Sequence, residues 1–213
     1  MALYVIAIVD EPVPPFRVGQ RPFRSVKCAP GVFAIVERRA EAPTVTDLHV
    51  RAQHRAVVHA SRKVDAILPV RFGTLLQADD LIDVVRNFEE DIHEALEDVH
   101  GKVQMTIRVI GGPPHVPPRK KSSGRKAPGR EYLEALRAAL HVPIPRTARP
   151  VLRAVEPFVI RERRERGPGL ATIYHLVKRE DVRPYRAAFD GNIVPAAHLT
   201  GPWPPFAFTP RLF

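Results

Sequence analysis

The sequence is poor in the residues from which proteins build covalent and metal chemistry. Its 213 residues include a single cysteine, Cys28. One cysteine excludes a disulfide within the chain and a thiolate metal cluster, and it agrees with a reducing compartment. The neighbours of Cys28 offer no local base, so we interpret it as a small, partly buried apolar side chain and not as a nucleophile.

Long apolar runs are missing as well. No stretch comes near the roughly 18 uncharged apolar residues that a membrane-spanning helix needs. The opening MALYVIAIVD has a short apolar run with no basic segment before it and an acid directly after it, which is not the pattern of a signal peptide. We therefore expect a soluble, cytoplasmic protein without a membrane span.

Constellations of catalytic or ligand-binding residues are also absent. His93 and Glu97 are four residues apart and would share a helix face, but structural zinc needs four ligands. No serine lies in a glycine-flanked elbow, and the glycines at 111–112 and 167–169 do not lead into a helix that could bind phosphate. We predict no catalytic residue, no metal, no cofactor and no small-molecule substrate, hence no enzyme.

What the chain does have is a large apolar fraction, 45%, and an uneven distribution of its net charge of +10. Residues 1–110 hold 14 Lys and Arg against 15 Asp and Glu, whereas residues 111–213 hold 19 against 8. The apolar content suffices for a sizeable core. The charge asymmetry suggests attraction between domains, subunits or acidic partner proteins.

The first 110 residues alternate between strand and helix patterns. Apolar runs predict strands at 3–9, 31–37 and 66–72, and alternation predicts another at 103–109. Thr46 can cap a helix that runs to about Lys63, with a modest apolar stripe that includes Leu48 and Ala56. The clearest helix pattern spans 81–101 and carries a strongly acidic outer face. We expect an α+β sandwich, ferredoxin-like in character, over 1–110.

The composition changes between residues 111 and 129, which are rich in Pro, Gly and basic residues and contain no acid. This pattern predicts a linker or a disordered loop. A second, smaller α+β domain follows at 130–200, with predicted helices at 131–140, 149–158 and 180–189 and strands at 171–177 and 196–199. An extended tail at 201–213 completes the predicted organisation.

The basic run at 119–126 within this linker leaves a second class of function open. Clustered Lys and Arg release counterions from phosphate backbones, so a nucleic-acid-binding module is the alternative hypothesis. The run has no interleaved aromatic residues for base stacking and belongs to no predicted helix. A solvated, flexible loop that keeps the chain soluble is the other interpretation, and we do not expect a nucleic-acid partner.

Two motifs are harder to explain as ordinary surface or loop. The first is LPVRFGT: Leu68, Pro69, Arg71, Phe72, Gly73 and Thr74 with Val70 between them. A proline within a strand indicates an edge or a bulge. We expect Arg71 either to extend past the apolar core or to form a partly buried ion pair, the alternative being an exposed arginine on an edge strand.

The second motif is the tail segment LTGPWPPFAF, which contains Gly201, Pro202, Trp203, Pro204, Pro205 and Phe206. Its prolines remove backbone donors and fix φ, so they predict an extended rod that is neither helix nor central strand. Its aromatic side chains would be costly to leave in water. We expect the tail to bind in a groove of its own chain, with docking on another subunit as the alternative.

Together, LPVRFGT and TGPWPPFAF resemble the gas vesicle protein F/L family, whose marks are L-P-x-R-F-G-T and a terminal T-G-P-W-P-P-Y-S-F. Phe206-Ala207 stands where the family usually has Tyr-Ser. The resemblance implies a two-domain accessory or minor structural protein of gas vesicles, located at the vesicle in the cytoplasm. It also implies that the chain binds the shell protein and other vesicle proteins during shell nucleation and assembly, with the motif residues forming a domain seam or a partner-binding surface.

Overall fold

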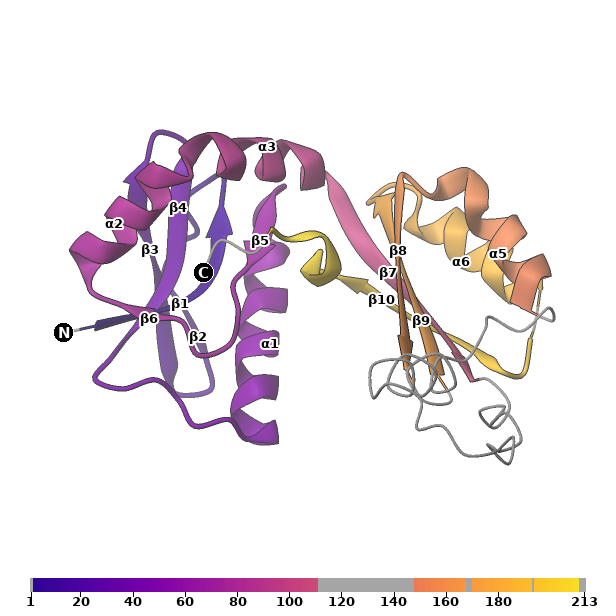
Figure 1. Ribbon diagram of the computed structural model, residues 1–213, viewed down its shortest axis with the longest axis horizontal. Coiled ribbons are helices and arrows are strands. Elements are labelled where there is room, and N and C mark those ends of the chain that lie inside the picture. The colour runs from indigo at the N-terminus through magenta and orange to yellow at the C-terminus, as the bar shows by residue number, and fades with distance from the viewer. Residues whose placement is uncertain (1, 111–147, 168–169, 193, 211–213) are drawn as a thin grey trace, which may run out of the picture. The chain divides into compact units, whose positions relative to one another are not determined.

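The computed structural model describes residues 2–110, 148–167, 170–192 and 194–210. The chain forms two compact units (Figure 1). The first contains residues 1–104 together with 202–213, and the second contains residues 105–201. The linker predicted at 111–129 and the helix predicted at 131–140 lie outside the described residues.

The first unit is built on one six-stranded sheet. Its strand order is β2-β3-β4-β1-β5, and β6 also pairs with β1. Its strands are β1 (Ala2–Val9), β2 (Phe16–Val18), β3 (Arg21–Ala29), β4 (Val32–Arg39), β5 (Ile67–Pro69) and β6 (Leu75–Leu76). The pairs β1–β4, β3–β4, β2–β3 and β1–β5 are antiparallel. All eight residues of β1 are buried, which explains why this strand reads as a continuous apolar run.

Both faces of β1 are covered by helices (Figure 1). Leu3 and Val5 belong to the core shared with helices α2 (Ala78–Asn87) and α3 (Glu89–Val99). Tyr4 and Ile6 belong to the core shared with helix α1 (Asp47–Ser61). A register shift between Val5 and Ala7 interrupts the alternation of side chains between the two faces of the strand. Despite this irregularity, β1 contributes side chains to both cores.

The helices of the first unit follow the sequence with one difference. Thr46 caps α1 as expected, its side chain accepting a hydrogen bond from the backbone N–H of His49. The long amphipathic pattern at 81–101, however, forms two helices that meet at Phe88. The φ and ψ of Phe88 are −120° and 24°, which are not helical values, so the backbone bends at this residue.

The second unit contains a four-stranded sheet with strand order β10-β7-β9-β8. Its strands are β7 (Lys102–Ile110), β8 (Arg161–Gly167), β9 (Leu170–Lys178) and β10 (Ala197–Trp203). Helices α5 (Arg149–Val155) and α6 (Val182–Asp190) cover one face, and a 3₁₀ turn (Glu156–Phe158) follows α5 (Figure 1). The core of this unit combines Ile107, Ile173, Val151 and Tyr185.

The architecture is mixed α and β with two sheets, as expected, but several strands have no counterpart in the sequence-based prediction. The segment between the strands predicted at 3–9 and 31–37 forms β2 and β3, and the charged run RERRERG forms β8. The ferredoxin-like arrangement expected for the first unit is not confirmed, because four strands precede its first helix. Among the described residues, no helix combines the length and apolarity required to cross a membrane.

Candidate functional site

The LPVRFGT motif forms the end of an edge strand and the turn that follows it. Leu68 and Pro69 are buried in β5, where they pair with Ile8 and Ala7 of β1. Because β5 is the last strand in the sheet order, the missing N–H of Pro69 interrupts no central ladder. The edge position predicted from this proline is therefore confirmed.

The turn from Arg71 to Thr74 depends on a glycine. Gly73 has a φ of 94°, which side chains other than glycine rarely tolerate and which suits the third position of a type II turn. The backbone carbonyl of Arg71 accepts hydrogen bonds from the side-chain hydroxyl of Thr74, at 2.9 Å, and from its N–H, at 3.4 Å. The Arg71 side chain is exposed, so it matches the exposed alternative and not the buried ion pair.

A buried hydrogen-bond network attaches this turn to α1. The hydroxyl of Tyr4 donates to Oε1 of Gln53, and Nε2 of Gln53 donates to the carbonyl of Val70 at 2.9 Å. The N–H of Gly73 donates to the Tyr4 hydroxyl at 3.4 Å, and the ring of Phe72 lies edge-on to Tyr4 with centroids 6.3 Å apart. Burial raises the pKa of Tyr4 despite the Gly73 hydrogen bond and the nearby arginines, so its hydroxyl stays a donor.

The tail begins as a strand and continues as a short helical turn. Gly201 and Pro202 belong to β10, and the carbonyl of Gly201, whose φ is 117°, accepts a hydrogen bond from Arg186. Pro204 and Pro205 are buried. Residues Phe206–Phe208 form a 3₁₀ turn, so the prediction of a purely extended rod is wrong at this point.

The aromatic side chains of the tail pack on α1 within the first unit. The rings of Trp203 and Phe206 lie 5.2 and 5.3 Å from the ring of His54, edge-on and stacked respectively. The N–H of Ala207 donates to Oε1 of the buried Gln104 at 2.8 Å. Burial lowers the pKa of His54, so the imidazole between these rings is neutral near pH 7.

Helix α1 therefore holds both motifs through adjacent residues. Gln53 binds the strand that precedes the turn, and His54 contacts the tail. The sequence identified both motifs but gave no sign of these two residues as their common support. A polar Gln on the buried face of a helix was the available signal, since such a side chain requires buried partners.

Aliphatic side chains are exposed at the N-terminal end of α1 and just before it. Val45, Leu48 and Val50 are 84%, 68% and 41% exposed. Leu48 was predicted to lie on the buried stripe, but the buried residues of α1 are Gln53, Ala56, Val57 and Ala60. We call Val45 and Leu48, which lie three residues apart, the aliphatic patch; Val50 is two residues from Leu48 and points to another side of the helix.

The second unit contains a buried hydrogen-bond network of His175, Glu162 and Tyr185 that the sequence did not indicate. His175 is 1% exposed; its Nε2 lies 3.0 Å from a carboxylate oxygen of Glu162 and its Nδ1 lies 2.7 Å from the hydroxyl of Tyr185. Burial lowers the pKa of His175 even though Glu162 opposes this effect. In the neutral imidazole Nε2–H donates to Glu162, and Nδ1 accepts from Tyr185.

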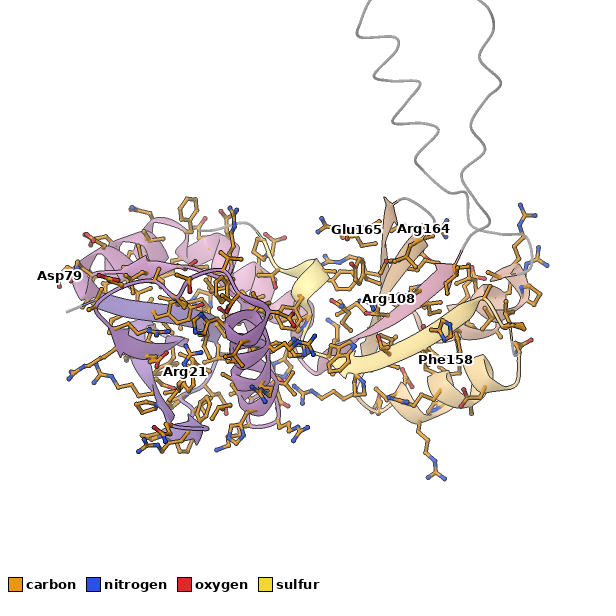
Figure 2. All side chains as sticks on the ribbon, turned by 90° about the horizontal axis from the view of Figure 1, so that it is seen from below. Arg21, Asp79, Arg108, Phe158, Arg164 and Glu165 are labelled. Carbon is orange, nitrogen blue, oxygen red and sulfur yellow. The ribbon has the colours of Figure 1, made fainter. Side chains whose placement is uncertain are left out.

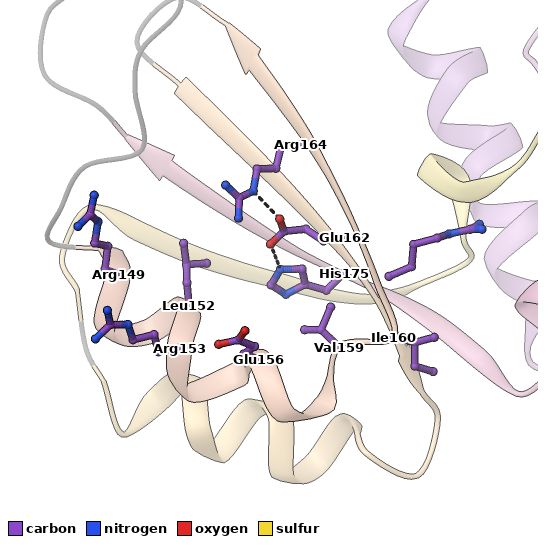
Figure 3. A pocket seen from close by; sticks show the side chains of 10 residues that line it. Arg149, Leu152, Arg153, Glu156, Val159, Ile160, Glu162, Arg164 and His175 are labelled. Carbon is purple, nitrogen blue, oxygen red and sulfur yellow. Dashed lines mark hydrogen bonds and ion pairs between the residues drawn. The ribbon is translucent and has the colours of Figure 1, made fainter.

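His175 and Glu162 form one wall of a pocket of about 700 Å³ in the second unit (Figure 3). Arginines and aliphatic residues dominate the lining. Its residues come from α5, the 3₁₀ turn, the two residues that connect this turn to β8, β8 itself and β9: Arg149, Leu152, Arg153, Glu156, Val159, Ile160, Arg161, Glu162, Arg164 and His175. Glu162 also accepts a hydrogen bond from Nε of Arg164, so both of its oxygens are engaged within the wall.

A metal site is not found in the part of the chain that the structure describes, where no three His, Cys, Asp or Glu side chains are grouped to bind an ion. His93 lies 3.9 Å from Glu89 on α3 and is partly exposed. Cys28 is buried, and its burial raises the pKa of the thiol, which disfavours the thiolate needed of a nucleophile.

Two solved structures share this fold. The crystal structure of gas vesicle protein GvpF from Microcystis aeruginosa has a TM-score of 0.72 and 12% sequence identity, over 97% of this chain and 98% of that chain. GvpF from Anabaena sp. PCC7120 has a TM-score of 0.69 and 12% identity, over 98% of each chain. No curated protein matches the sequence.

An identity of 12% to these structures shows the fold but not the family. The family is shown by a comparison with a family model. The model of the gas vesicle synthesis protein GvpL/GvpF matches residues 2–210, a range that includes LPVRFGT and the tail motif. The turn held by Gly73 and the tail held by His54 are thus described within a matched region that spans nearly the whole sequence. The chain belongs to the gas vesicle synthesis protein GvpL/GvpF family.

Proposed function

We propose that this protein is an accessory or minor structural protein that binds other gas vesicle proteins, the hydrophobic shell protein among them, during shell nucleation and assembly in the cytoplasm. Family membership supports the role in gas vesicles. Binding to the shell protein is the part of the proposal that requires a surface. The aliphatic patch on α1 is the observation that carries it.

Exposed aliphatic side chains favour a protein partner. Val45 and Leu48 are 84% and 68% exposed and lie three residues apart at the start of α1. Burying such side chains in an interface is favourable by roughly 25 cal/mol per Å² of apolar area. A small hydrophobic shell protein offers the apolar surface needed to cover them.

The tail is a less suitable docking element, because its apolar side chains already have intramolecular contacts. Trp203 and Phe206 pack on His54, and Phe208 is buried. Docking the tail on a partner would first require these contacts to break. We therefore assign Leu68, Pro69 and the turn, together with the tail, a supporting role beneath the binding surface; their predicted position at a seam between domains stays a prediction.

The proposal is tested by co-purification of the shell protein with the full chain and with Leu48→Asp. An aspartate at this exposed position leaves the core intact but opposes an apolar contact. We expect retention of the shell protein to fall about tenfold, the effect of losing one well-buried aliphatic contact. Ile110→Asp, which changes a side chain that is 52% exposed in the second unit, is the matched control and should retain the partner.

Two results would remove this function. One is failure of the unmodified chain to retain any vesicle protein. The other is equal retention by Leu48→Asp and the unmodified chain, which would show that the patch is not the binding surface. Normal vesicle formation in cells that lack the protein would further contradict a role in assembly.

The nucleic-acid alternative rests on residues 119–126, which lie outside the described residues. No described feature favours it. It stays a hypothesis that salt-dependent binding of duplex and single-stranded nucleic acid, before and after deletion of 119–126, would decide.

We also propose that the two compact units are the two domains of the protein, and that the ferredoxin-like description suits the second. Its described elements follow one another as β7, α5, β8, β9, α6 and β10 in a sheet ordered β10-β7-β9-β8. This β-α-β-β-α-β succession is that of a split βαβ fold. Separate expression of 105–201 would test whether it folds alone.

A further inference from the structure

The pocket of the second unit has the chemistry of a site for carboxylates. All the cations among its lining residues are arginines, and arginine binds carboxylates in planar, bidentate fashion. Arg149 and Arg153 are four residues apart on α5, and Arg161 and Arg164 lie on β8. Figure 2 shows the side chain of Arg164 on this strand beside that of Glu165. Two glutamates oppose the four arginines, so the lining keeps a positive excess.

Apolar side chains complete the pocket and limit what can fill it. Leu152, Val159 and Ile160 contribute to the lining, and Ile160 is 47% exposed. An inorganic anion would satisfy the arginines but leave these aliphatic groups in water. A protein surface that presents carboxylates around an apolar side chain would satisfy both parts of the lining.

The chain itself carries such a surface on its first unit. Residues 78–99, which form α2 and α3, contain nine Asp and Glu and one basic residue other than histidine, Arg86. Phe88 lies at the junction of these helices and is 42% exposed. Glu89, Glu90 and Asp91 follow it directly, so three carboxylates lie close in sequence to an exposed aromatic ring.

Five of these nine acids lie in the first turns of α2 and α3, where the helix dipole favours them, but two lie where it does not. Glu97 and Asp98 lie in the last turn of α3, which has no basic residue, although the helix dipole favours cations at that end. Lys102 supplies one cation there through hydrogen bonds to the carbonyls of Glu97 and Asp98. An interaction with a basic partner would offset the negative charge at this end of α3.

We propose that the arginine-lined pocket is a docking site for the acidic α2–α3 surface of a second copy of this chain. In such a contact Arg149 and Arg153 face carboxylates that flank Phe88, and the Phe88 ring lies against Leu152 and Ile160. The inference goes beyond the proposed function, because it concerns copies of this protein alone and not the shell protein.

Association of this kind is heterologous, because two different surfaces of the chain meet. A growing series always keeps a free pocket at one end and a free acidic surface at the other, so association is not limited to a dimer unless the series closes into a ring. Screening by salt should weaken it. Both properties distinguish it from a symmetric apolar dimer.

The test is sedimentation velocity on the full chain over a range of protein concentrations at low and at high salt. We expect the average mass to increase with concentration and the increase to diminish at high salt. Arg153→Glu reverses one charge in the pocket, and Glu90→Lys reverses one charge on the acidic surface. Each reversal alone should weaken association about tenfold, since it places like charges together.

A mixture of the two variants provides the sharpest outcome. An Arg153→Glu copy keeps its acidic surface and a Glu90→Lys copy keeps its pocket, so the two can form one intact interface. The mixture should therefore associate more strongly than either variant alone. The two altered surfaces carry opposite charges after the reversals, so the series can also continue through them. Arg55→Glu, an exposed change on α1, is the control and should associate as the unmodified chain does.

Four results would overturn the inference. They are a chain that stays monomeric at every concentration at low salt, association unchanged by either reversal, a mixture of the two variants that stays monomeric, and Arg55→Glu weakening association as much as Arg153→Glu does. The last result would show that net charge alone governs the effect. If Arg153→Glu fails to fold by circular dichroism, Arg149→Glu takes its place.

Discussion

At the residue scale, the protonation of His175 affects the stability of the second unit. Burial holds its pKa below the ordinary value. Below about pH 6.5 the unfolded chain therefore takes up a proton that the folded chain does not, so stability is lost as the pH falls through the folded pKa. Burial raises the pKa of Glu162, but hydrogen bonds from Arg164 and His175 outweigh this and lower it, which adds a loss of stability at more acidic pH.

Urea denaturation between neutral pH and about pH 5 measures this dependence. His175→Gln, which removes the titrating group but keeps polar contacts with Glu162 and Tyr185, should show a smaller loss over the same range. His54, whose pKa is also lowered by burial, titrates in both proteins, so the difference between them isolates His175. Identical pH profiles for the two proteins would contradict the prediction.

Gly73 provides a second prediction at the same scale. A Cβ at this position would meet no atom within 4 Å, so Gly73→Ala introduces backbone strain without a steric contact. With φ at 94° we expect a loss of about 1–2 kcal/mol in the free energy of unfolding. Gly73→Asn should cost less, because asparagine tolerates positive φ better. Chemical denaturation of both variants checks the order.

At the scale of elements, α1 joins the turn of LPVRFGT to the rest of the first unit. Gln53→Ala would remove both the acceptor of the Tyr4 hydroxyl and the donor to the Val70 carbonyl. Leaving buried polar groups unpaired costs about 1–3 kcal/mol each, so the loss of stability should reach about 2–4 kcal/mol. Tyr4→Phe combined with Gln53→Leu should recover part of it, as measured by thermal unfolding; no recovery would contradict this account.

The tail is the other element supported by α1. Trp203→Ala removes an aromatic contact with His54, and the partial exposure of the ring places the expected loss at about 1–3 kcal/mol, below that of a fully buried tryptophan. Calorimetry of the full chain should show a lower midpoint for the first unit. Phe206→Ala, at a ring that is 38% exposed, should have a smaller effect. Loss of partner binding at unchanged stability would instead identify the tail as a docking arm.

Elements with a clear hydrophobic pattern were predictable, and those without one were not. The buried run of β1 and the Thr46 cap of α1 appear in the sequence as they do in the structure. β8, RERRERG, contains no apolar residue. It forms a strand because each of its residues, from Arg161 to Gly167, pairs with a residue of β9. A strand that depends on its neighbour for its conformation carries no periodic signal of its own.

At the scale of the whole molecule, the two motifs were predictable but the residues that hold them were not. The tail and the turn stand out through proline, glycine and aromatic residues, whose conformational effects are local. Gln53, His54 and His175 act through contacts with residues distant in sequence. Only the fold brings those partners together, which is why spacing along the chain did not reveal them.

The first unit also has a feature that concerns the order of synthesis. Its residues come from both ends of the sequence, since 202–213 join 1–104 after the chain has passed through the whole second unit. When β1 to β6 have emerged from the ribosome, Trp203 and Ala207 have not yet been synthesised. His54 therefore has no contact with Trp203 at this stage, and Gln104 has no hydrogen bond from Ala207. A chain interrupted before residue 203 would lack both contacts, so an unfinished copy differs from a finished one in the packing of its first unit, a difference that chaperones and proteases can recognise.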